Sequence, residues 1–385
     1  MMIRRTSLLA AAAVLSLSLA ACSSTPTTTG NEDAGVSQKA EQALEQIKGQ
    51  VLSKGPNGEA PSPSSAADLT PEEIEQVKGL GATAAIVMHY GGNDWATAQI
   101  NGLKSEFEKL GIRVIATTDA NFKPDKQVSD IETVLSQKPN IIVSIPTDPV
   151  ATASAYKRAS EAGAKLVFMD NVPQGLTAGQ DYVSVVSADN FGNGVVSAHQ
   201  MAKALGGQGK IGLVFHQADF FVTKQRYDGF KETITKEYPD IQIVEEKGIA
   251  GPDFAGDAQA AANAMLSKYP DLSGIWAVWD VPAEGVMAAA RASGRQDLKI
   301  ATEDLGKNVA IGLAKNELIV GLGAQVPFDQ GVTEARLAAG ALIGKQAPAY
   351  VALSALPVDH ANVLDAWKQV YHEDAPKELQ DSYEQ

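Results

Sequence analysis

The segment Ile141-Ile-Val-Ser-Ile-Pro-Thr-Asp148 contains the pattern that decides the fold. Its residues up to 145 are almost all apolar, which predicts a strand that is covered on both faces. A polar group, Thr147 and Asp148, follows directly at the carboxyl end of that strand. Strands covered on both faces belong to parallel sheets between layers of helices, where ligands collect at the carboxyl ends of the strands. This segment therefore predicts both the architecture and the position of a site.

Similar strand-like runs recur along the chain at the spacing of one strand, helix, strand unit. We predict strands at 83–88, 112–116, 141–145 and 165–169, and a second series at 210–215, 241–245, 274–278 and 298–301. Helices fill the intervals; one has Ile100, Leu103 and Phe107 on its apolar face and ends at Gly111. A strand at 319–322, a helix at 330–343, a strand at 350–353 and a helix at 361–371 follow. The predicted fold class is α/β, with two Rossmann-like lobes that each contain an open parallel sheet.

The composition excludes several classes of protein. A length of 385 residues predicts two or three domains, and 44% hydrophobic residues are typical of a globular chain. The net charge of −14 argues against a nucleic-acid partner, because a phosphate backbone needs a basic surface. The single cysteine excludes an intrachain disulfide and any CxxC motif, and the five histidines have no metal-ligand spacing. We therefore expect no metal and no cofactor.

The N-terminal segment is typical of an exported protein. Residues 1–21 begin with Arg4 and Arg5, continue through apolar and small residues, and contain no acidic residue, as in a secretory signal. The boundary at Ala21 and Cys22 resembles the lipobox of bacterial lipoproteins, which implies that Cys22 is lipidated and anchors the protein to a membrane. The alternative is a plain signal peptide followed by a free thiol.

The next segment, residues 22–79, is predicted to be a flexible tether with short helices. It is rich in Ser, Thr, Pro and Gly at 23–35 and again at 53–69. A short amphipathic helix is expected over 36–52. Thr70, Pro71 and Glu73 provide an N-cap, a first-turn proline and a capping-box glutamate, so another helix is expected to begin there.

Acids, amides, bases and aromatic residues gather at the predicted carboxyl ends of the strands. In the first half the candidates are Asp94, Trp95, Asn121, Asp148 and Asn171; in the second half they are Lys224, Arg226, Phe254, Trp279, Asp280, Asp304 and Gln325. Carboxylates and amides form paired hydrogen bonds with hydroxyl groups, and ring faces cover C–H surfaces. The mixture is what a hydroxyl-rich small ligand requires.

The order of these motifs resembles that of the sugar-binding, periplasmic-type solute receptors of ABC importers, the group that contains the ribose receptor. The resemblance covers about residues 80–355. It is carried by Asp94-Trp95, Pro146-Thr-Asp148, Ser187-Ala-Asp-Asn190, Arg226-Tyr-Asp-Gly-Phe230, and Gln325 before Pro327 and Gln330-Gly331. It implies a type I periplasmic-binding-protein fold, with Asn121 and Asp148 binding hydroxyl groups from the first lobe. In the second lobe it implies ligand contacts from Lys224, Phe254, Trp279, Asp304 and Gln325.

Two positions depart from the pattern of that family. Lys224 stands where the ribose-type receptors usually have arginine, and lysine cannot form a planar, bidentate pair. Arg226 is then either the replacement or a brace for its loop. Trp279 stands beside Asp280 where the family has asparagine, so an amide is exchanged for apolar area. A pentose, a related monosaccharide such as a deoxysugar, and a sugar alcohol all remain open as ligands.

Structural roles compete with binding roles at several candidates. Asp148 and Asp304 could instead cap the helices that follow them. Trp279 could pack within its lobe, and Phe220 and Phe221 could fill the interface between the lobes without touching a ligand. Trp276, inside a predicted strand, is expected in the core.

Enzyme motifs give little support for catalysis. The sequence Gly207-Gln-Gly-Lys-Ile-Gly212 matches a dinucleotide fingerprint in form, but it precedes a strand where that motif must follow one. Neither a GxSxG elbow nor a phosphate-binding GxxxxGK[ST] loop occurs in the sequence. The acids of the expected cleft leave an extracellular glycosidase as the enzymatic alternative.

The expected domains are a signal peptide at 1–21, a tether at 22–79, a first lobe at 80–180 and 326–352, and a second lobe at 181–325 and 353–375. The lobes are expected to be joined by three crossing segments near 171–187, 325–328 and 353–357.

The expected function is that of an exported, lipid-anchored substrate-binding protein of an ABC transporter, not an enzyme. It is expected to be a monomer that binds a small carbohydrate, delivers it to a permease driven by an ATPase, and touches the membrane only through its lipid. The alternative is a receptor that presents a sugar or signal molecule to a membrane sensor.

Overall fold

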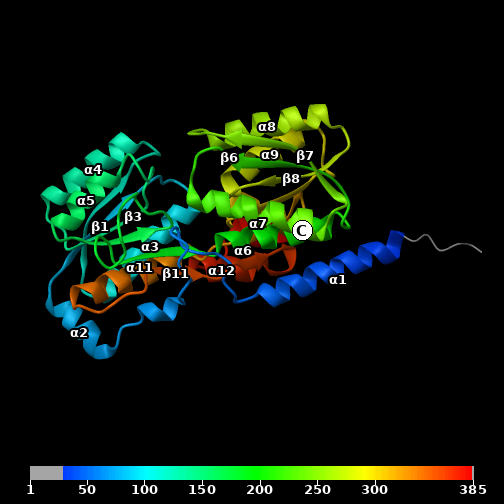
Figure 1. Cartoon of the computed structure of the whole chain (residues 1–385). Helices are drawn as coiled ribbons and strands as arrows, with labels where there is room; N and C mark the ends of the chain where they lie inside the picture. The colour runs from blue at the N-terminus through cyan, green and yellow to red at the C-terminus, as the bar shows by residue number, and fades with distance from the viewer. Residues whose placement is uncertain (1–28, 384–385) are drawn as a thin grey trace, which may run out of the picture.

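The structure is a computed structural model that describes residues 29–383. Its first sheet contains β1 (Thr83–Met88), β2 (Arg113–Asp119), β3 (Ile141–Ser144), β4 (Lys165–Met169), β5 (Ser184–Ala188) and β11 (Tyr350–Leu353). Its second sheet contains β6 (Gly209–His216), β7 (Ile241–Ile249), β8 (Leu272–Ala277), β9 (Lys299–Glu303), β10 (Ile319–Ala324) and β12 (Leu356–Val358). Each sheet forms the centre of one lobe, and the two lobes lie side by side (Figure 1).

The two sheets have equivalent topologies. The strand order is β11-β5-β4-β3-β1-β2 in the first lobe and β12-β10-β9-β8-β6-β7 in the second, so each strand has a counterpart at the same position. All pairs are parallel except β10 with β12, in which Leu322 lies opposite Val358. The predicted fold class, two α/β lobes with open parallel sheets, is confirmed.

Helices surround both sheets. In the first lobe and before it lie α1 (Thr29–Ile47), η1 (Ser64–Ala67), α2 (Pro71–Gly79), α3 (Asp94–Lys109), α4 (Pro124–Ser136), α5 (Ala153–Glu161) and α11 (Pro327–Leu342). The second lobe has α6 (Asn190–Ala204), α7 (Phe221–Glu237), α8 (Phe254–Lys268), α9 (Asp280–Ala292), α10 (Lys307–Ala314), η2 (His360–Asn362), α12 (Val363–Tyr371) and α13 (Lys377–Tyr383).

The apolar strands are buried on both faces because their successive side chains enter two different layers. In β1, Ile86 packs in a cluster with Phe107 of α3 and Ala338 of α11. The next residue, Val87, packs in a separate cluster that contains Ile131 of α4 and other residues of α4 and α5. A strand between two helical layers needs apolar residues at consecutive positions, which is why these segments do not alternate.

The first passage between the lobes differs from its predicted place. Ser184–Ala188 forms β5, which pairs with β4 and β11 in the first sheet. Residues 181–188 therefore belong to the first lobe, and the chain crosses at Asp189 instead of within 171–187. The reason is that this apolar run finds two parallel neighbours in the first sheet. The other passages lie between β10 and α11 and between β11 and β12.

The segment predicted as a tether is largely packed against the lobes within the described part of the chain. Ser53 and Ala67 are buried, with 2% and 3% of their surface exposed. Thr70 Oγ1 accepts a hydrogen bond from Glu73 N, and the Glu73 carboxylate accepts one from Thr70 N, so the predicted capping box is present. The signal peptide at 1–21 and Cys22 lie outside the described residues. Over residues 29–383, no helix is both long and apolar enough to span a bilayer.

The predicted end of the second lobe and the predicted burial of Trp276 can also be compared with the structure. Helix α13 extends the second lobe past residue 375, and Lys307 of α10 pairs with Glu378 of α13 at 3.3 Å. Trp276 is completely buried in β8, as expected, and its indole Nε1 donates to Glu303 Oε1 at 3.0 Å.

Candidate functional site

A cavity of about 60 Å³ lies between the two lobes, where the carboxyl ends of their strands meet. His89 and Tyr90 follow β1, Asp170 follows β4, and Asp304 and Gln325 follow β9 and β10. The cavity is lined by His89, Tyr90, Asn93, Trp95, Phe122, Ile145, Asp170, Phe220, Val222, Thr223, Arg226, Trp279, Asp304 and Gln325. The position agrees with the general rule that open α/β sheets bind ligands at this edge.

Aromatic rings from both lobes form the walls of the cavity. The ring of His89 in the first lobe lies 4.7 Å from that of Phe122 and is stacked on Phe220 of the second lobe at 5.9 Å. Trp95 meets His89 edge-on at 6.0 Å. On the side of the second lobe, the Trp279 indole lies 5.6 Å from the ring of His216. Such rings can cover the C–H faces of a small ligand while polar groups beside them bind its hydroxyls.

An ion pair in the second lobe forms the polar floor. Arg226 Nη1 lies 2.9 Å from Asp304 Oδ2, and Nη2 lies 3.2 Å from Oδ1, a bidentate pair. Gln325 Nε2 donates to the same carboxylate at 2.9 Å. Arg226 also donates to Asn190 Oδ1 at 3.0 Å and to the Val278 carbonyl at 3.2 Å. These bonds occupy most of the guanidinium donors, so Arg226 positions Asp304 and Gln325 rather than presenting a free fork.

Asp170 is the counterpart of Asp304 in the first lobe. Each aspartate follows the equivalent strand of its sheet, and each has a positive φ, 57° at Asp170 and 64° at Asp304. Aspartate is one of the few residues that tolerate this left-handed region. Asp170 Oδ1 accepts a hydrogen bond from Ser187 Oγ at 2.6 Å, while burial raises the pKa of Asp170 to about 6. The cavity is thus lined by two aspartates: Asp304, which is paired with Arg226, and Asp170, which has no cationic side chain bonded to it.

Burial keeps the two cleft histidines neutral at neutral pH. It lowers the pKa of His89 to about 3 and that of His216 to about 4. His216 Nδ1 lies 3.2 Å from Thr223 Oγ1. Neither imidazole therefore adds a positive charge to the cleft, and each can both donate and accept a hydrogen bond.

Three residues that line the cavity carry a buried polar atom with no hydrogen-bond partner among the described residues. The atoms are Nδ1 of His89, Nε1 of Trp95 and Oε1 of Gln325. Their side chains are almost inaccessible, with 5%, 8% and 3% of the residue surface exposed. An unpaired buried polar atom costs about 1 to 3 kcal/mol, so three around one cavity indicate groups arranged for a polar ligand.

A second, outer chamber of about 520 Å³ adjoins the first, and Phe122 and Phe220 line both. The outer chamber is lined by Asn121, Phe122, Lys123, Pro124, Thr147, Asp148, Pro149, Val150, His216, Ala218, Asp219, Phe220, Ala250, Gly251, Pro252 and Phe254. It lies between loops of the two lobes, since Asp148 and Val150 belong to the first lobe and Ala218 and Pro252 belong to the second.

Eight of the twelve candidate binding residues line one of these chambers. Trp95, Arg226, Trp279, Asp304 and Gln325 line the inner cavity, and Asn121, Asp148 and Phe254 line the outer chamber. Asp148 Oδ1 also accepts hydrogen bonds from Val150 N and Ala151 N and so stabilises a turn, but it does not cap the following helix α5, which begins at Ala153 after Thr152. Asp304 does not cap a helix; its partners are Arg226 and Gln325.

The other four candidates lie outside both linings. Lys224 is exposed on α7 and pairs with Asp228, so Arg226 instead of Lys224 faces the cleft. Asp94 Oδ2 accepts a hydrogen bond from Lys307 N of the other lobe at 2.8 Å. Asp280 is buried beneath the floor, where burial and then the charge of Asp304 raise its pKa well above its ordinary value. Asn171 is buried beside Asp170, and its Nδ2 donates to the Pro146 carbonyl at 3.4 Å.

The sequence-based list missed several lining residues. They are His89, Tyr90, Asn93, Phe122, Ile145, Asp170, Phe220, Val222 and Thr223. One signal could have found Asp170, because it stands one residue after β4 just as Asp304 stands one residue after the equivalent strand β9. Phe220 was considered only as a residue that fills the interface between the lobes without touching a ligand; it packs against the first lobe but also lines the cavity.

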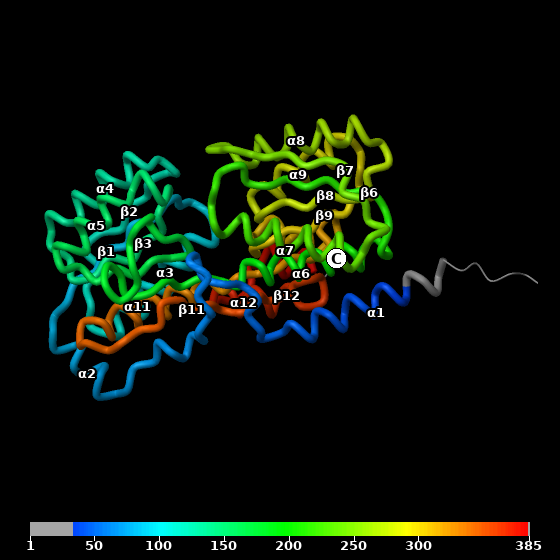
Figure 2. The backbone as a smooth tube through the Cα atoms, viewed as in Figure 1, coloured from blue at the N-terminus to red at the C-terminus, as the bar shows by residue number. Residues whose placement is uncertain are grey.

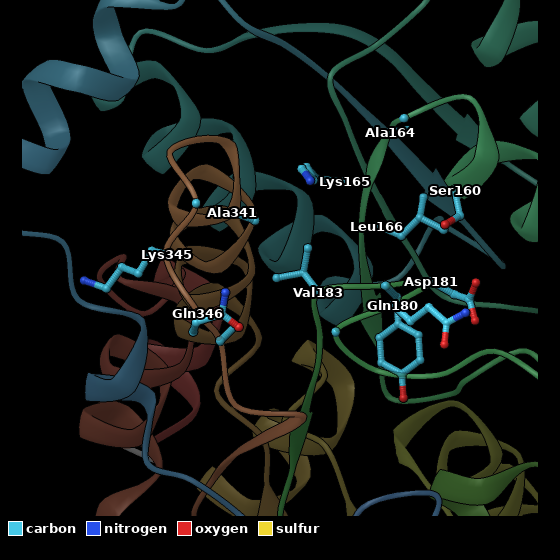
Figure 3. Close-up of a pocket in the computed structure, with 15 residues that line it drawn as sticks. Ser160, Ala164, Lys165, Leu166, Gln180, Asp181, Val183, Ala341, Lys345 and Gln346 are labelled. Carbon is cyan, nitrogen blue, oxygen red and sulfur yellow. The ribbon is translucent and has the colours of Figure 1, made fainter.

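A separate hollow of about 240 Å³ lies at the opposite, amino end of the first sheet (Figure 3). It is lined by residues at the start of β4, such as Lys165, and by Gln180, Asp181, Lys345 and Gln346. Its lining comes from the first lobe alone and includes a single aromatic side chain, Tyr182, whereas rings from both lobes surround the inner cavity. Within the described part of the chain, no group of three or more His, Cys, Asp or Glu residues could hold a metal ion.

Comparisons with known proteins agree with this geometry. A family profile described as a periplasmic binding protein domain matches residues 84–346. The ribose import binding protein of Bacillus subtilis (strain 168) is 27% identical over 246 residues, which are 64% of this chain and 76% of that protein. A solute binding protein of an ABC transporter from Agrobacterium vitis, solved with bound allitol, is 26% identical with a TM-score of 0.66. The match covers 74% of this chain and 98% of that one. An arabinose binding protein from Geobacillus stearothermophilus is 26% identical with a TM-score of 0.64, over 73% and 98% of the two chains.

Proposed function

We propose that this chain, which belongs to the periplasmic binding protein family, is the substrate-binding component of an ABC importer. Its ligand in this proposal is a small carbohydrate, either a pentose, a related monosaccharide or a sugar alcohol. Relatives support this choice, because one is named as a ribose import binding protein and a similar structure contains allitol.

The observation that carries the proposal is the set of unpaired polar atoms around the inner cavity. His89 Nδ1, Trp95 Nε1 and Gln325 Oε1 are buried between aromatic walls and have no partner among the described residues. Hydroxyl groups both donate and accept, so neighbouring hydroxyls of one small molecule can satisfy these three atoms. A purely apolar ligand would leave them unpaired, at a cost in binding free energy.

The charges of the two chambers favour a neutral ligand. Among the residues that line them, the cationic side chains are those of Arg226 and Lys123. Arg226 is bound to Asp304, and Lys123 is exposed at the outer chamber. Asp170 adds a carboxylate to the inner cavity. A sugar acid or sugar phosphate would find no free buried cation there, so we expect such anions to bind more weakly than the corresponding neutral polyols.

Closure of the two lobes around the ligand would perform the capture. In the described arrangement the lobes touch at Lys307 N and Asp94 Oδ2 and through the stacked rings of His89 and Phe220. A ligand that bonds to both lobes stabilises this closed state relative to an open one. The closed protein would then be the form that a permease recognises.

The site of action belongs to the same proposal. The N-terminal sequence supports export and lipidation at Cys22, which would hold the protein at the outer side of a membrane without a spanning helix. The receptor would then concentrate its ligand beside the permease, while an ATPase on the other side of the membrane drives transport.

A thermal-shift screen tests the proposed ligand class. Pentoses, hexoses and sugar alcohols with four to six carbons would be added to the purified protein, since a ligand that binds only the folded state raises the Tm. At 100 times the Kd we expect about 2.7 kcal/mol of added stability. The shift should shrink in Gln325→Ala, and it should persist in Gln180→Ala, which alters the distant hollow. The absence of a shift with every compound, or an equal shift in both variants, would contradict the proposal.

A further inference from the structure

Residues 50–69, the N-terminal strap, lie outside the family match, which begins at residue 84. They follow α1, which packs against α6 of the second lobe, and they precede α2, which packs against α11 in the first lobe. Figure 2 shows this blue part of the tube running from α1 past α12 and β11 to α2. The strap thus joins the lobes at the side where the other three passages of the chain cross.

The first end of the strap is held by the second lobe. Lys39 Nζ of α1 donates to the Glu237 carbonyl at 2.6 Å and lies over the ring of Tyr238. Glu41 of α1 pairs with Lys203 of α6 at 2.9 Å. These contacts fix α1 to the second lobe before the strap begins.

Asp189 ties the strap to the hinge itself. Its carboxylate accepts hydrogen bonds from Leu52 N and Ser53 N, both at 2.8 Å, and from Ser53 Oγ at 2.7 Å. Its backbone N donates to the Leu353 carbonyl at 2.8 Å, on the third passage between the lobes. Asp189 is itself the first residue after β5, at the first passage. Asp189, with 1% of its residue surface exposed, therefore joins the strap to two of the three hinge segments, through its carboxylate to the strap and through its backbone N to the third passage.

The second end of the strap is held by the first lobe. Ser62 N donates to the Tyr350 carbonyl at 3.0 Å, and Ala352 N donates to the Ser62 carbonyl at 3.2 Å, so the strap extends the sheet beside β11. A few residues later, Asp68 pairs with Arg336 of α11 at 2.9 Å. Ala67 is buried in the core cluster of this lobe.

The connection between the two ends is short and folded. Eight residues lie between Ser53 and Ser62, and within that interval Gly55 N donates a hydrogen bond to the Glu59 carbonyl at 2.9 Å. With both ends fixed to different lobes, a short segment with internal bonds cannot follow a large rotation without breaking some of them. Proteins of two lobes otherwise move about their hinge segments by default.

We propose that the N-terminal strap is a fourth connection between the lobes that restricts opening of the cleft and favours the closed state. The strap thereby regulates how readily the proposed ligand site is exposed. The statement that the strap regulates exposure of the ligand site rests on the proposed function. The statement that it restricts opening of the lobes does not, so an experiment can contradict either one alone.

The test cuts the strap without removing it. A recognition sequence for a specific protease would be inserted after Asn57, which is exposed. Distances between the lobes would be measured in the protein without the insertion, which is the reference, and in the protein with the insertion before and after cleavage. Spin labels at Gln137→Cys in the first lobe and Gln242→Cys in the second, in a Cys22→Ser background, report that distance by pulsed electron paramagnetic resonance. A matched control carries the same insertion between Ala162 and Gly163, in a turn inside the first lobe. All measurements are made without ligand.

We expect cleavage of the strap to broaden the distance distribution and move it to longer distances, and cleavage of the control to leave it unchanged. An unchanged distribution after complete cleavage of the strap would overturn the proposal. So would a loss of the cooperative melting transition on cleavage of the strap, because the strap would then serve the folding of a lobe. Since no sugar is used, failure of the ligand screen has no bearing on this result.

Discussion

At the scale of single residues, Arg226 and Asp304 form an ion pair that is buried in the second lobe beneath the cavity. Their side chains are 3% and 10% exposed. Removing one partner from such a pair leaves a buried charge without compensation, which costs about 3 to 5 kcal/mol. We expect Arg226→Met to lower the free energy of unfolding by about that amount.

A double variant distinguishes the cost of an unpaired buried charge from a general loss of packing. Asp304→Asn in the Arg226→Met background removes the stranded charge, so urea unfolding should show a smaller loss than in the single variant. Arg158→Met breaks an exposed pair with Glu132 and should cost less than about 1 kcal/mol. A double variant that is less stable than Arg226→Met would show that the charge is not the cause.

Glu303, the neighbour of Asp304, makes stability depend on pH. Its Oε1 accepts bonds from Ser197 Oγ at 2.6 Å and Trp276 Nε1 at 3.0 Å, and burial raises the pKa of Glu303 from 4.5 to about 8. The folded state therefore holds a proton that the unfolded state releases above about pH 4.5. Stability from this group is complete below that pH and falls, by at most about 1.4 kcal/mol per pH unit, until the pH passes about 8.

Glu303→Gln keeps the acceptor and removes the titration. We expect the variant to show a flatter dependence of unfolding free energy on pH between 5 and 8, and to gain stability relative to the parent as the pH rises. Urea unfolding at several pH values measures both curves. Parallel curves for parent and variant would contradict the assignment to Glu303.

Asp304 and Gln325, each the first residue after a strand, were predicted correctly as lining residues, whereas the choice between Lys224 and Arg226 on α7 could not be made from the sequence. Lys224 and Arg226 both follow the strand-end loop, and their spacing of two places them on different sides of α7. The register of α7 decides between them: Thr223 and Arg226, three residues apart, both line the cavity, and Lys224 points to solvent. That register is set by packing of Phe220 and Val222 against the core cluster of the first lobe, a contact between distant segments.

At the scale of elements, the contact between α3 and α11 depends on two glycines. A Cβ atom at Gly102 would lie 2.1 Å from the Phe328 carbonyl oxygen, and one at Gly331 would lie 2.5 Å from the Gln99 carbonyl oxygen. The obstacles are backbone atoms, so a methyl group can be accommodated only if the helices move apart. The helices meet this closely because both contact positions lack a side chain.

Gly102→Ala should therefore destabilise the protein, by about 1 to 3 kcal/mol or more, because it overpacks the interface between α3 and α11. Gly79→Ala in helix α2 is the matched control, since nothing lies within 4 Å of a Cβ at that position. Alanine is the better helix former, so the control should be neutral or slightly stabilising. Equal melting temperatures for the two variants would argue against the close contact.

The elements themselves were largely predictable, because apolar runs and helical faces are local signals. The assignment of β5 to a lobe was not, since nothing in the segment Ser184–Ala188 specifies which sheet it joins, and its pairing with β4 and β11 is decided in three dimensions. The contact of Ser53 with Asp189 joins positions 136 residues apart and leaves no periodic trace in the sequence. For this reason the packed strap was predicted as a flexible tether.

At the scale of the whole molecule, a hydrogen bond between the two lobes stabilises their closed arrangement, and its contribution can be tested without a ligand. Lys307 N, at the start of α10 in the second lobe, donates to Asp94 Oδ2, at the start of α3 in the first, at 2.8 Å. Without the carboxylate, the closed state loses a charge-assisted hydrogen bond that the open state cannot form. The equilibrium between the states should then move toward the open one.

We expect Asp94→Ala to increase the radius of gyration of the ligand-free protein in small-angle X-ray scattering. Asp125→Ala is the control, because Asp125 is likewise an acid in the first turn of a helix, α4, and is exposed. Both substitutions remove a favourable interaction with a helix N-terminus, worth about 0.3 to 1 kcal/mol, so a general effect on stability appears in both. An effect on closure appears in Asp94→Ala alone. Identical scattering from the two variants would mean that this bond does not decide closure, and that other contacts between the lobes, such as the stacked rings of His89 and Phe220 or the N-terminal strap, hold them together.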